Sequence, residues 1–281
     1  MIGGFLLPRL SDSGFRINAV SRRYQGRASD ADARLSWHAW DDIRADAGWL
    51  SDTHAVIHLA PLGTLPPLIP ILAEAGVKRL IAFGSTSVFT KINSGDAREQ
   101  QWSRMLEEAE AEIARSADTS GMAWTIFRPT LIYAPGRDSN VTTIARFIER
   151  FGFFPLVGQG PGLRQPVYAD DLAQACLSVL GNPSTYGKAY NLSGGETLSY
   201  RNMVIRLFDQ LKRPVRLVSL PLFALRWSLT LLSWLPGYRY INPEMANRIN
   251  RDLCFDAADA KRDFGFDPRR FLERIESPNW V

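Results

Sequence analysis

The residues with the greatest bearing on chemistry flank a stretch of sequence that contains no lysine and no tyrosine. This stretch lies between Lys91 and Tyr133. Before it stands the segment GSTSVF at 84–89, and at its end the segment FRPTLIYAPG at 127–136. Segments of this type normally bracket a Tyr-x-x-x-Lys pair, in which the phenol exchanges a proton with a substrate hydroxyl or keto group. The sequence therefore keeps the surroundings of an acid/base pair but lacks the pair itself.

Apolar segments of strand and helix type alternate through the first half of the chain. The expected strands cover 15–21, 35–40, 55–60, 80–83 and 123–131, and the expected helices cover 65–75, 99–116, 141–151 and 171–180. This alternation predicts an α/β protein with a Rossmann-type, doubly wound parallel sheet. Beyond residue 195 the pattern turns helical. We expect a dinucleotide-binding domain at 1–155 and a smaller, mostly helical substrate domain at 156–281, with segments crossing back.

The chain opens on a pattern that belongs inside such a fold rather than at its start. Residues 1–7 (MIGGFLL) resemble the helix that follows a glycine-rich turn, with Gly3 as the last glycine of that turn. The turn and helix N-terminus normally receive the dinucleotide pyrophosphate. We therefore expect the first strand to be missing, the pyrophosphate site to be weakened and a place in the sheet to be open beside the second strand.

Charged residues at the ends of the next two strands bear on the choice of cofactor. Arg22 and Arg23 follow the strand at 15–21, where arginine suits the 2′-phosphate of NADP and an acidic residue suits the free 2′-hydroxyl of NAD. The pair favours NADP slightly over NAD, although two solvated loop arginines are an alternative. Asp41 or Asp42, after the following strand, could accept a hydrogen bond from the adenine amino group.

Composition excludes several classes of function. The net charge of +4 comes without a run of basic residues, so we do not expect nucleic-acid binding. Cys176 and Cys254 have no metal-binding spacing and are expected to be buried thiols in a cytoplasmic protein without bound metal. The apolar stretch 217–235 contains Arg226 near its centre. We interpret it as an amphipathic helix rather than a transmembrane span, with weak contact to a membrane surface as the alternative.

Five motifs in order give the chain a family resemblance. They are VIHLA at 56–60, GSTSVF at 84–89, FRP with IYAPG at 127–136, GLRQPVYADDLA at 162–173 and DFGFDP at 263–268. In this combination the chain resembles the extended short-chain dehydrogenase/reductase superfamily, in its NAD-dependent epimerase/dehydratase branch. The resemblance extends from Gly3 to about Phe271.

The resemblance implies roles for particular residues at the cofactor. Ser85 matches the Ser/Thr that hydrogen-bonds the substrate hydroxyl or keto oxygen and is the expected catalytic residue. Leu59 and Ala60 match the chain that passes the cofactor ribose. Pro129 and Ile132 match the segment that borders the nicotinamide.

The resemblance also implies a nucleotide-linked sugar as substrate. Arg164 matches the arginine that binds the substrate pyrophosphate, and the planar guanidinium suits two phosphate oxygens. Arg248 or Arg251 would be a second phosphate contact, with surface ion pairs as the alternative for all three. A homodimer through the helix at 99–116 is a further family expectation.

The catalytic pair itself cannot be transferred. The tyrosine position falls on Trp102 and the lysine position on Leu106, and neither side chain exchanges a proton at neutral pH. Two interpretations remain: an NAD(P)-dependent oxidoreductase or epimerase acting on a nucleotide-linked sugar with non-standard acid/base residues, and a catalytically silent NAD(P)-binding structural or regulatory module. A third, a damaged chain that has lost cofactor binding, would follow if the amino-terminal turn were truly missing.

Overall fold

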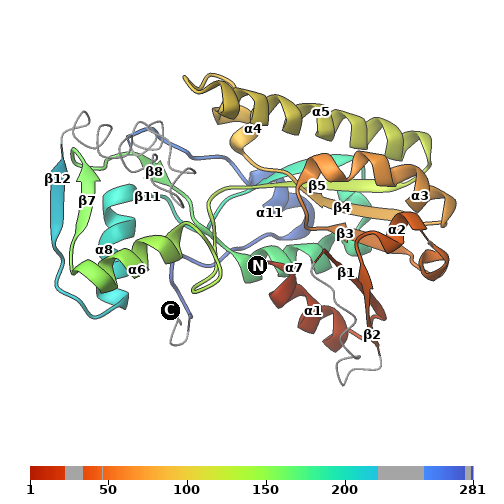
Figure 1. Cartoon of the computed structure of the whole chain (residues 1–281), viewed down its shortest axis with the longest axis horizontal. Helices are drawn as coiled ribbons and strands as arrows, with labels where there is room; N and C mark the ends of the chain where they lie inside the picture. Colours follow the sequence, from red (N-terminus) through yellow and green to blue (C-terminus); the bar gives the residue numbers. More distant parts are fainter. Residues whose placement is uncertain (23–33, 46, 221–249, 276–279, 281) are drawn as a thin grey trace.

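Four parallel strands form the central sheet of the computed structural model, which describes residues 1–22, 34–45, 47–220, 250–275 and 280 (Figure 1). The order across the sheet is β10-β5-β4-β3. The strands are β3 (Ala55–His58), β4 (Arg79–Phe83), β5 (Ala123–Pro129) and β10 (Lys188–Leu192). All three pairings are parallel, as the alternating pattern predicts.

Helices cover both faces of this sheet, and strand β4 shows how the sequence directs them. Leu80 and Ala82 point into an apolar cluster with α3 (Ile69–Glu74) and α5 (Ala97–Thr119). Ile81 and Phe83 point into a second cluster on the opposite face, because side chains alternate along a strand. That face is covered by α1 (Gly3–Asp12), α7 (Ala169–Leu180) and α11 (Ala258–Phe264). The predicted α/β, doubly wound fold is confirmed.

A second, smaller sheet lies beside the first. It consists of β1 (Ile17–Ser21) paired in parallel with β2 (Leu35–Ala39). Within the part of the chain that the structure describes, β1 forms no pairing with β3. The separation lies beside β1, where the sequence predicts an open place in the sheet.

A further group of elements forms a smaller unit at one end of the long axis (Figure 1). This unit contains the third apolar cluster of the molecule, which joins α6 (Val141–Phe151), β7 (Phe154–Val157) and α8 (Tyr200–Gln210). Short pairs complete it: β12 (Leu217–Leu220) with β7, β11 (Leu198–Ser199) with β8 (Leu163–Arg164), and β6 (Ile132–Tyr133) with β9 (Val167–Tyr168). The domain boundary near residue 155 stays a prediction. Helix α6 precedes residue 155 but packs in the small unit, whereas α7 and β10 follow it but belong to the layers of the central sheet.

Two expected helices differ from the structure. The stretch 65–75 follows the 3-10 turn η2 (Leu62–Thr64), begins with a second one, η3 (Pro66–Leu68), and becomes α-helical only in α3. Prolines at 66, 67 and 70 have no N–H to donate, which shortens the helix. The stretch expected as a helix from Leu217 begins as strand β12, because its backbone pairs with β7, and residues 221–235 lie outside the described residues. Strand β11, which also follows residue 195, likewise departs from the helical pattern expected there.

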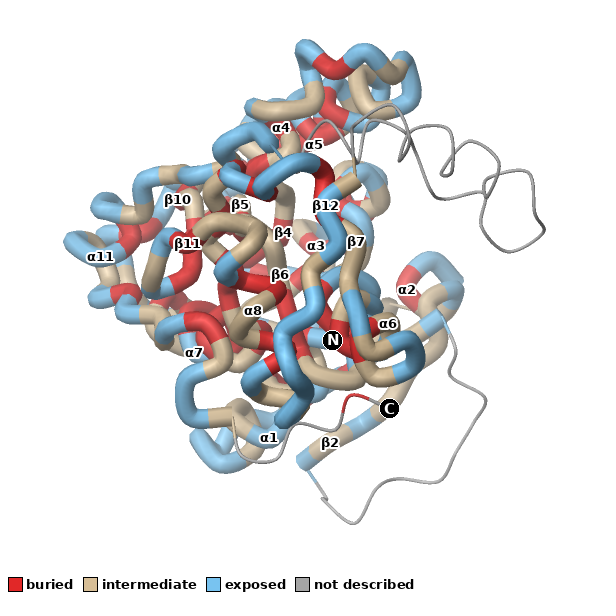
Figure 2. Tube along the Cα trace, turned by 90° about the vertical axis from the view of Figure 1, so that its left-hand side faces the viewer, coloured by how far each residue is buried: buried red, intermediate tan, exposed pale blue. Residues whose placement is uncertain are grey.

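One buried cation joins three elements beneath the sheet. Arg79, at the start of β4, is 1% exposed and donates to Thr125 Oγ1, the Val179 carbonyl and Thr185 Oγ1. Burial lowers the pKa of this guanidinium to about 10. Strand β4 is buried along its whole length, and buried residues, drawn red in Figure 2, gather in the interior of the molecule. Among the described residues, no helix is long and apolar enough to span a membrane.

Candidate functional site

The N-terminus of α1 lies against the carboxyl end of β3, which brings two expected cofactor residues together. A Cβ atom on Gly3 would lie 3.5 Å from Leu59 Cδ1. Leu59 itself is 38% exposed directly after the strand, and Ala60 beside it is half-buried. No side chain caps this helix start. The Gly4 and Phe5 N–H groups donate to the carbonyls of Met1 and Ile2, which leaves the N–H groups of Ile2 and Gly3, with the positive dipole end, for an anion.

A residue that sequence reasoning missed stands at the same helix start. Arg137 places Nη1 2.9 Å from the position that a Cβ on Gly4 would take, and its guanidinium lies 5.5 Å from the Phe5 ring centroid. The arginine is exposed and adds a positive charge to that of the helix end. The signal in the sequence was its place as the first charged residue after the IYAPG motif.

The other end of the expected dinucleotide site is only partly described. Arg22 is exposed directly after β1, whereas Arg23 lies outside the described residues. Asp42 accepts a hydrogen bond from the Ala39 backbone N–H at 2.8 Å and thereby holds the turn after β2. Asp41, which is exposed, is therefore the better candidate for the adenine amino group.

Ser85 stands at the carboxyl end of β4 in a small hydroxyl cluster. Its Oγ donates to Ser87 Oγ at 2.9 Å and accepts from the Ser87 backbone N–H at 3.1 Å. Both side chains are half-buried, so the Ser85 hydroxyl is fixed in position without being sealed from solvent. Ser103, on α5, donates to the Val88 carbonyl at 2.8 Å and anchors the helix beside this cluster.

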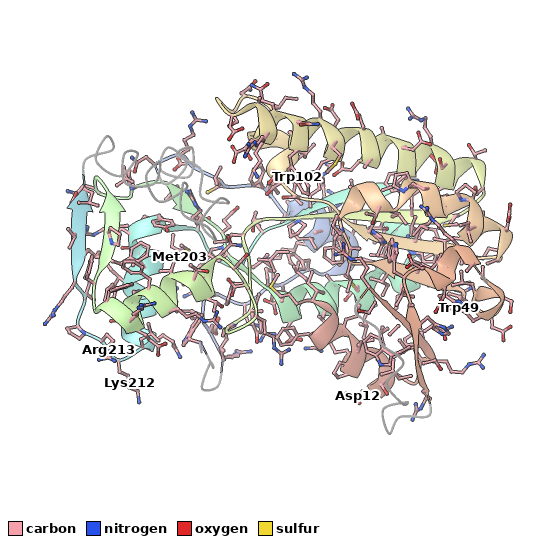
Figure 3. All side chains as sticks on the ribbon, viewed as in Figure 1. Asp12, Trp49, Trp102, Met203, Lys212 and Arg213 are labelled. Atoms are coloured by element: carbon pink, nitrogen blue, oxygen red, sulfur yellow. The ribbon has the colours of Figure 1, made fainter. Side chains whose placement is uncertain are left out.

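The two positions of the missing acid/base pair differ in their surroundings. Trp102 is 41% exposed near the start of α5 (Figure 3). Leu106, one turn later, is 2% exposed in an apolar cluster with Leu62 and Leu65. An ammonium group in place of Leu106 would have to be desolvated among these side chains. The helix therefore presents a packed apolar surface at the lysine position.

Hydrogen bonds from Thr86 to a backbone carbonyl hold the segment that is expected to border the nicotinamide. The Pro129 carbonyl accepts from both the N–H and the Oγ1 of Thr86, each at 3.2 Å. Ile132 is half-buried in β6. These contacts do not test a role at the nicotinamide, so that role stays a prediction for both Pro129 and Ile132.

Arg164 supports the small unit as well as being a candidate for phosphate binding. It is 6% exposed, and its Nη1 donates to the carbonyls of Leu163 and Arg251 at 2.7 Å each. Its guanidinium also lies 5.7 Å from the Tyr200 ring centroid. The structure thus brings Arg164 and the Arg251 backbone together, while Arg248 lies outside the described residues.

Several other polar residues have contacts that stabilise the fold. Tyr133 is fully buried, and its hydroxyl accepts from the Leu272 N–H at 3.0 Å, which is a packing role rather than that of a phenol donor. Asp170 and Asp171 lie in the first turn of α7, where their charge suits the helix dipole, and bind Arg9 and Arg269. The expectation of two buried thiols is wrong for Cys254, which is exposed.

His58 is buried at the end of β3 and belongs to the core edge. Its Nε2 lies 3.2 Å from Thr64 Oγ1 and 3.4 Å from the Pro61 carbonyl oxygen. Burial lowers the pKa of the imidazole, and the Pro61 contact opposes this only in part. The surroundings of His58 therefore favour the neutral imidazole.

The lowered pKa of His58 predicts a loss of stability in acid. Below the ordinary pKa of about 6.5 the unfolded chain takes up a proton that the folded chain resists. The free energy of unfolding should therefore fall as the pH drops from about 8 to about 5, and His58→Asn should flatten this fall. Denaturant titrations of both proteins at several pH values measure it. Parallel pH profiles for the two proteins would contradict the assignment.

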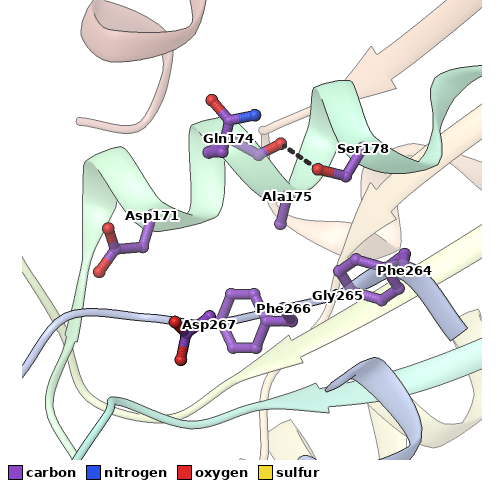
Figure 4. Close-up of a pocket in the computed structure, with 8 residues that line it drawn as sticks. All are labelled: Asp171, Gln174, Ala175, Ser178, Phe264, Gly265, Phe266 and Asp267. Carbon is purple, nitrogen blue, oxygen red and sulfur yellow. Dashed lines mark hydrogen bonds between the residues drawn. The ribbon is translucent and has the colours of Figure 1, made fainter. Parts of the chain in front are cut away.

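The cavity drawn in Figure 4 lies apart from these residues. It has a volume of about 110 Å³ and lies between α7 and the segment 264–267. None of the expected site residues lines it, and ligand pockets are usually about 300–1,000 Å³. Within the described ranges, no group of three or more His, Cys, Asp or Glu residues is placed to hold a metal ion.

Comparison with known proteins bears on the family and the fold. Residues 66–193 match the sequence model of the NAD-dependent epimerase/dehydratase family. Over these residues the chain resembles that family, and it shares its fold with solved epimerase and dehydratase structures. The resemblance seen in the sequence is confirmed.

Individual relatives show how far the likeness extends. The chain is 24% identical over 209 residues to a UDP-glucose 4-epimerase of Vibrio cholerae, covering 71% of this chain and 61% of that protein. It is 34% identical over 99 residues to an NADH dehydrogenase alpha subcomplex subunit 9 of Arabidopsis thaliana, covering 34% of this chain and 24% of that one. The chain thus spans less than two thirds of the length of either relative.

Among solved structures, MoeE5 in complex with UDP-glucuronic acid and NAD superposes with a TM-score of 0.71. The sequence identity is 19%, and the match covers 99% of this chain and 94% of that one. At this identity the superposition shows the fold.

Proposed function

We propose that this chain is an NAD(P)-dependent, epimerase-like protein that binds a nicotinamide dinucleotide and a nucleotide-linked sugar. The observation that carries the proposal is the convergence of the α1 N-terminus, Leu59 and Arg137 at the carboxyl end of the sheet. A helix N-terminus and a guanidinium together suit a pyrophosphate. NAD in the complex of MoeE5 supports the cofactor class.

The residues present fit the dinucleotide better at its phosphates than at its reactive end. Gly3 and Gly4 leave room where a Cβ would meet Leu59 and Arg137. When bound, the nicotinamide supplies a hydride acceptor or donor. Ser85 would hold the substrate oxygen, and Arg164 would contact the substrate phosphates. We keep Arg22 and Arg23 as the basis of a slight NADP preference.

The cofactor proposal predicts binding that depends on Arg137. Titration with NADH and NADPH, followed by nicotinamide fluorescence, should show saturable binding with the tighter affinity for NADPH. Arg137→Met should weaken binding by about tenfold, which corresponds to the loss of one charged hydrogen bond of about 1.4 kcal/mol. Arg44→Met, an exposed change on α2 (Asp42–Ala45), is the matched control. Absence of binding by either dinucleotide would refute the cofactor assignment.

A second candidate function is a silent binding module with a structural or regulatory role. The buried, apolar surroundings of Leu106 favour it, because they leave no group to support an acid/base residue at Trp102. The likeness to an NADH dehydrogenase subunit is in keeping with this function. Incubation with NAD and UDP-glucose as probe separates the two. Turnover that falls with Ser85→Ala supports the enzyme, whereas binding without turnover supports the module.

A further inference from the structure

Two neighbouring loops at the far end of the small unit expose aromatic and basic side chains together. One loop joins α6 to β7, and the other joins α8 to β12. They lie side by side because β7 pairs with β12 and the Phe154 N–H donates to the Arg216 carbonyl at 2.9 Å. Both loops lie at the end of the molecule opposite the central sheet (Figure 1). We call residues 150–153 and 212–216 the distal tip.

The apolar part of the distal tip is held out to solvent by its own packing. Phe151 is 51% exposed, Phe153 is 37% exposed and Val215 is 45% exposed. Phe147 supports the two rings, with centroid distances of 4.6 Å to Phe151 and 5.7 Å to Phe153. Gly152 between them has φ of +72°, a left-handed conformation that glycine adopts readily. Large apolar side chains grouped in this way mark an interaction site.

The charged part of the distal tip is cationic. Arg150, Lys212, Arg213 and Arg216 are all exposed, and Lys212 and Arg213 extend away from the ribbon in Figure 3. No described carboxylate lies within ion-pair distance of any of these four groups. The acidic residues nearest in sequence are Glu149 and Asp209. The tip therefore carries positive charge that the described residues leave unpaired.

We propose that the distal tip binds the surface of an anionic lipid bilayer. Aromatic rings insert at the boundary of headgroups and acyl chains, while surrounding Lys and Arg side chains attract acidic headgroups. A second copy of the chain does not suit the tip, since two such surfaces repel each other. A single-stranded nucleic acid suits it less well, because stacking sites for bases line a groove that follows the backbone, whereas this surface is the end of two loops. The surface is separate from the proposed cofactor site.

Vesicle co-sedimentation of the whole chain tests the proposal. The protein should bind vesicles of phosphatidylcholine with phosphatidylglycerol and should bind pure phosphatidylcholine at least about tenfold more weakly. Raising the salt from about 0.1 M to about 1 M should release it, because the Debye length shortens from about 10 Å to about 3 Å. Equal binding to both kinds of vesicle, or none to either, would overturn the proposal.

Matched variants locate the binding. Phe151→Ser with Phe153→Ser should lower the partition by about tenfold or more, and so should Lys212→Glu with Arg213→Glu and Arg216→Glu. The apolar control, Phe15→Ser with Ile92→Ser, changes side chains that are 46% and 38% exposed elsewhere. The charge control is Arg44→Glu with Lys78→Glu and Arg104→Glu, which are also exposed.

Both controls should bind as the unaltered chain does. Since segment 221–249 is identical in all variants, a loss confined to the tip variants cannot come from it. Tip variants that bind as well as their controls would overturn the proposal. Preferential binding to single-stranded DNA that displaces the vesicles would assign the tip to nucleic acid instead and would equally overturn it.

Discussion

Replacing Gly194 by alanine should destabilise the chain by on the order of 3 kcal/mol, and by more if the neighbouring backbone cannot move. A Cβ atom at this position would lie 1.8 Å from the Pro166 carbonyl oxygen and 2.5 Å from the Pro166 carbonyl carbon. The Gly194 N–H donates to the Gln165 carbonyl at 3.2 Å, so the two segments are also joined where they would clash. The contact is between backbones, and no side-chain rotation can relieve it. Denaturant unfolding of Gly194→Ala and the unaltered chain measures the difference.

Gly181 offers the matched control for this substitution. It follows α7, and a Cβ there would meet nothing within 4 Å. Its φ of −109° suits any residue, so Gly181→Ala should leave stability unchanged or raise it by about 0.4–1 kcal/mol. Opposite signs for the two variants are the expected result. An equal effect of both would mean that the close approach at Gly194 is relieved elsewhere.

The close approach of two backbone segments at Gly194 also affects the proposed nucleotide site. Gln165 and Pro166 follow Arg164 directly, and the neighbouring Gly195 N–H donates to the Arg269 carbonyl at 3.2 Å. Three distant segments of the chain therefore meet at two glycines, between the sheet and the small unit. A displacement there would move Arg164, so Gly194→Ala should also weaken nucleotide binding in any protein that remains folded.

The fold was predictable from the sequence because its signals are local. Periodic apolar residues in 141–151 and 171–180 indicated helices that the structure places at α6 and α7. The strand patterns of β3 and β4 were recognisable in the same way, since a buried parallel strand is a short continuous apolar run. Local signals failed where proline changed the helix type after Leu65 and where β12 gained its partner only through the fold.

The candidate site was predictable only in part because it depends on contacts between distant segments. Ser85 and Gly3 could be identified from their own motifs. The sequence marks Arg137 only as the first charged residue after the IYAPG motif, because its place beside Gly4 depends on how the loop after β6 meets α1. The apolar surroundings of Leu106 likewise come from the turn at Leu62, forty-four positions earlier in the printed sequence. No periodicity within either segment encodes that approach.

A partly buried ion pair beneath the Ser85 cluster gives the second large effect. Arg128 on β5 donates through Nε to both carboxylate oxygens of Glu110 on α5, at 2.9 and 3.1 Å. Glu110 is 8% exposed, and its Oε1 would lie 2.7 Å from a Cβ on Gly84, directly before Ser85. The pair therefore fixes the helix that carries Trp102 against the strand end that carries Ser85.

Arg128→Met should destabilise the chain by about 3–5 kcal/mol, because it leaves the Glu110 carboxylate buried without its partner. The double variant Arg128→Met with Glu110→Met should be more stable than Arg128→Met alone, since no charge then remains buried. The Glu112–Arg115 pair on the same helix is exposed, and its removal should change stability little. Denaturant unfolding of the single and double variants gives the coupling energy. If the two single effects simply add in the double variant, the carboxylate is solvated in the absence of Arg128. The pair would then not be what holds α5 over the site. A large coupling, by contrast, would show that the helix keeps its place through Glu110 even though Trp102 and Leu106 replace the acid/base pair.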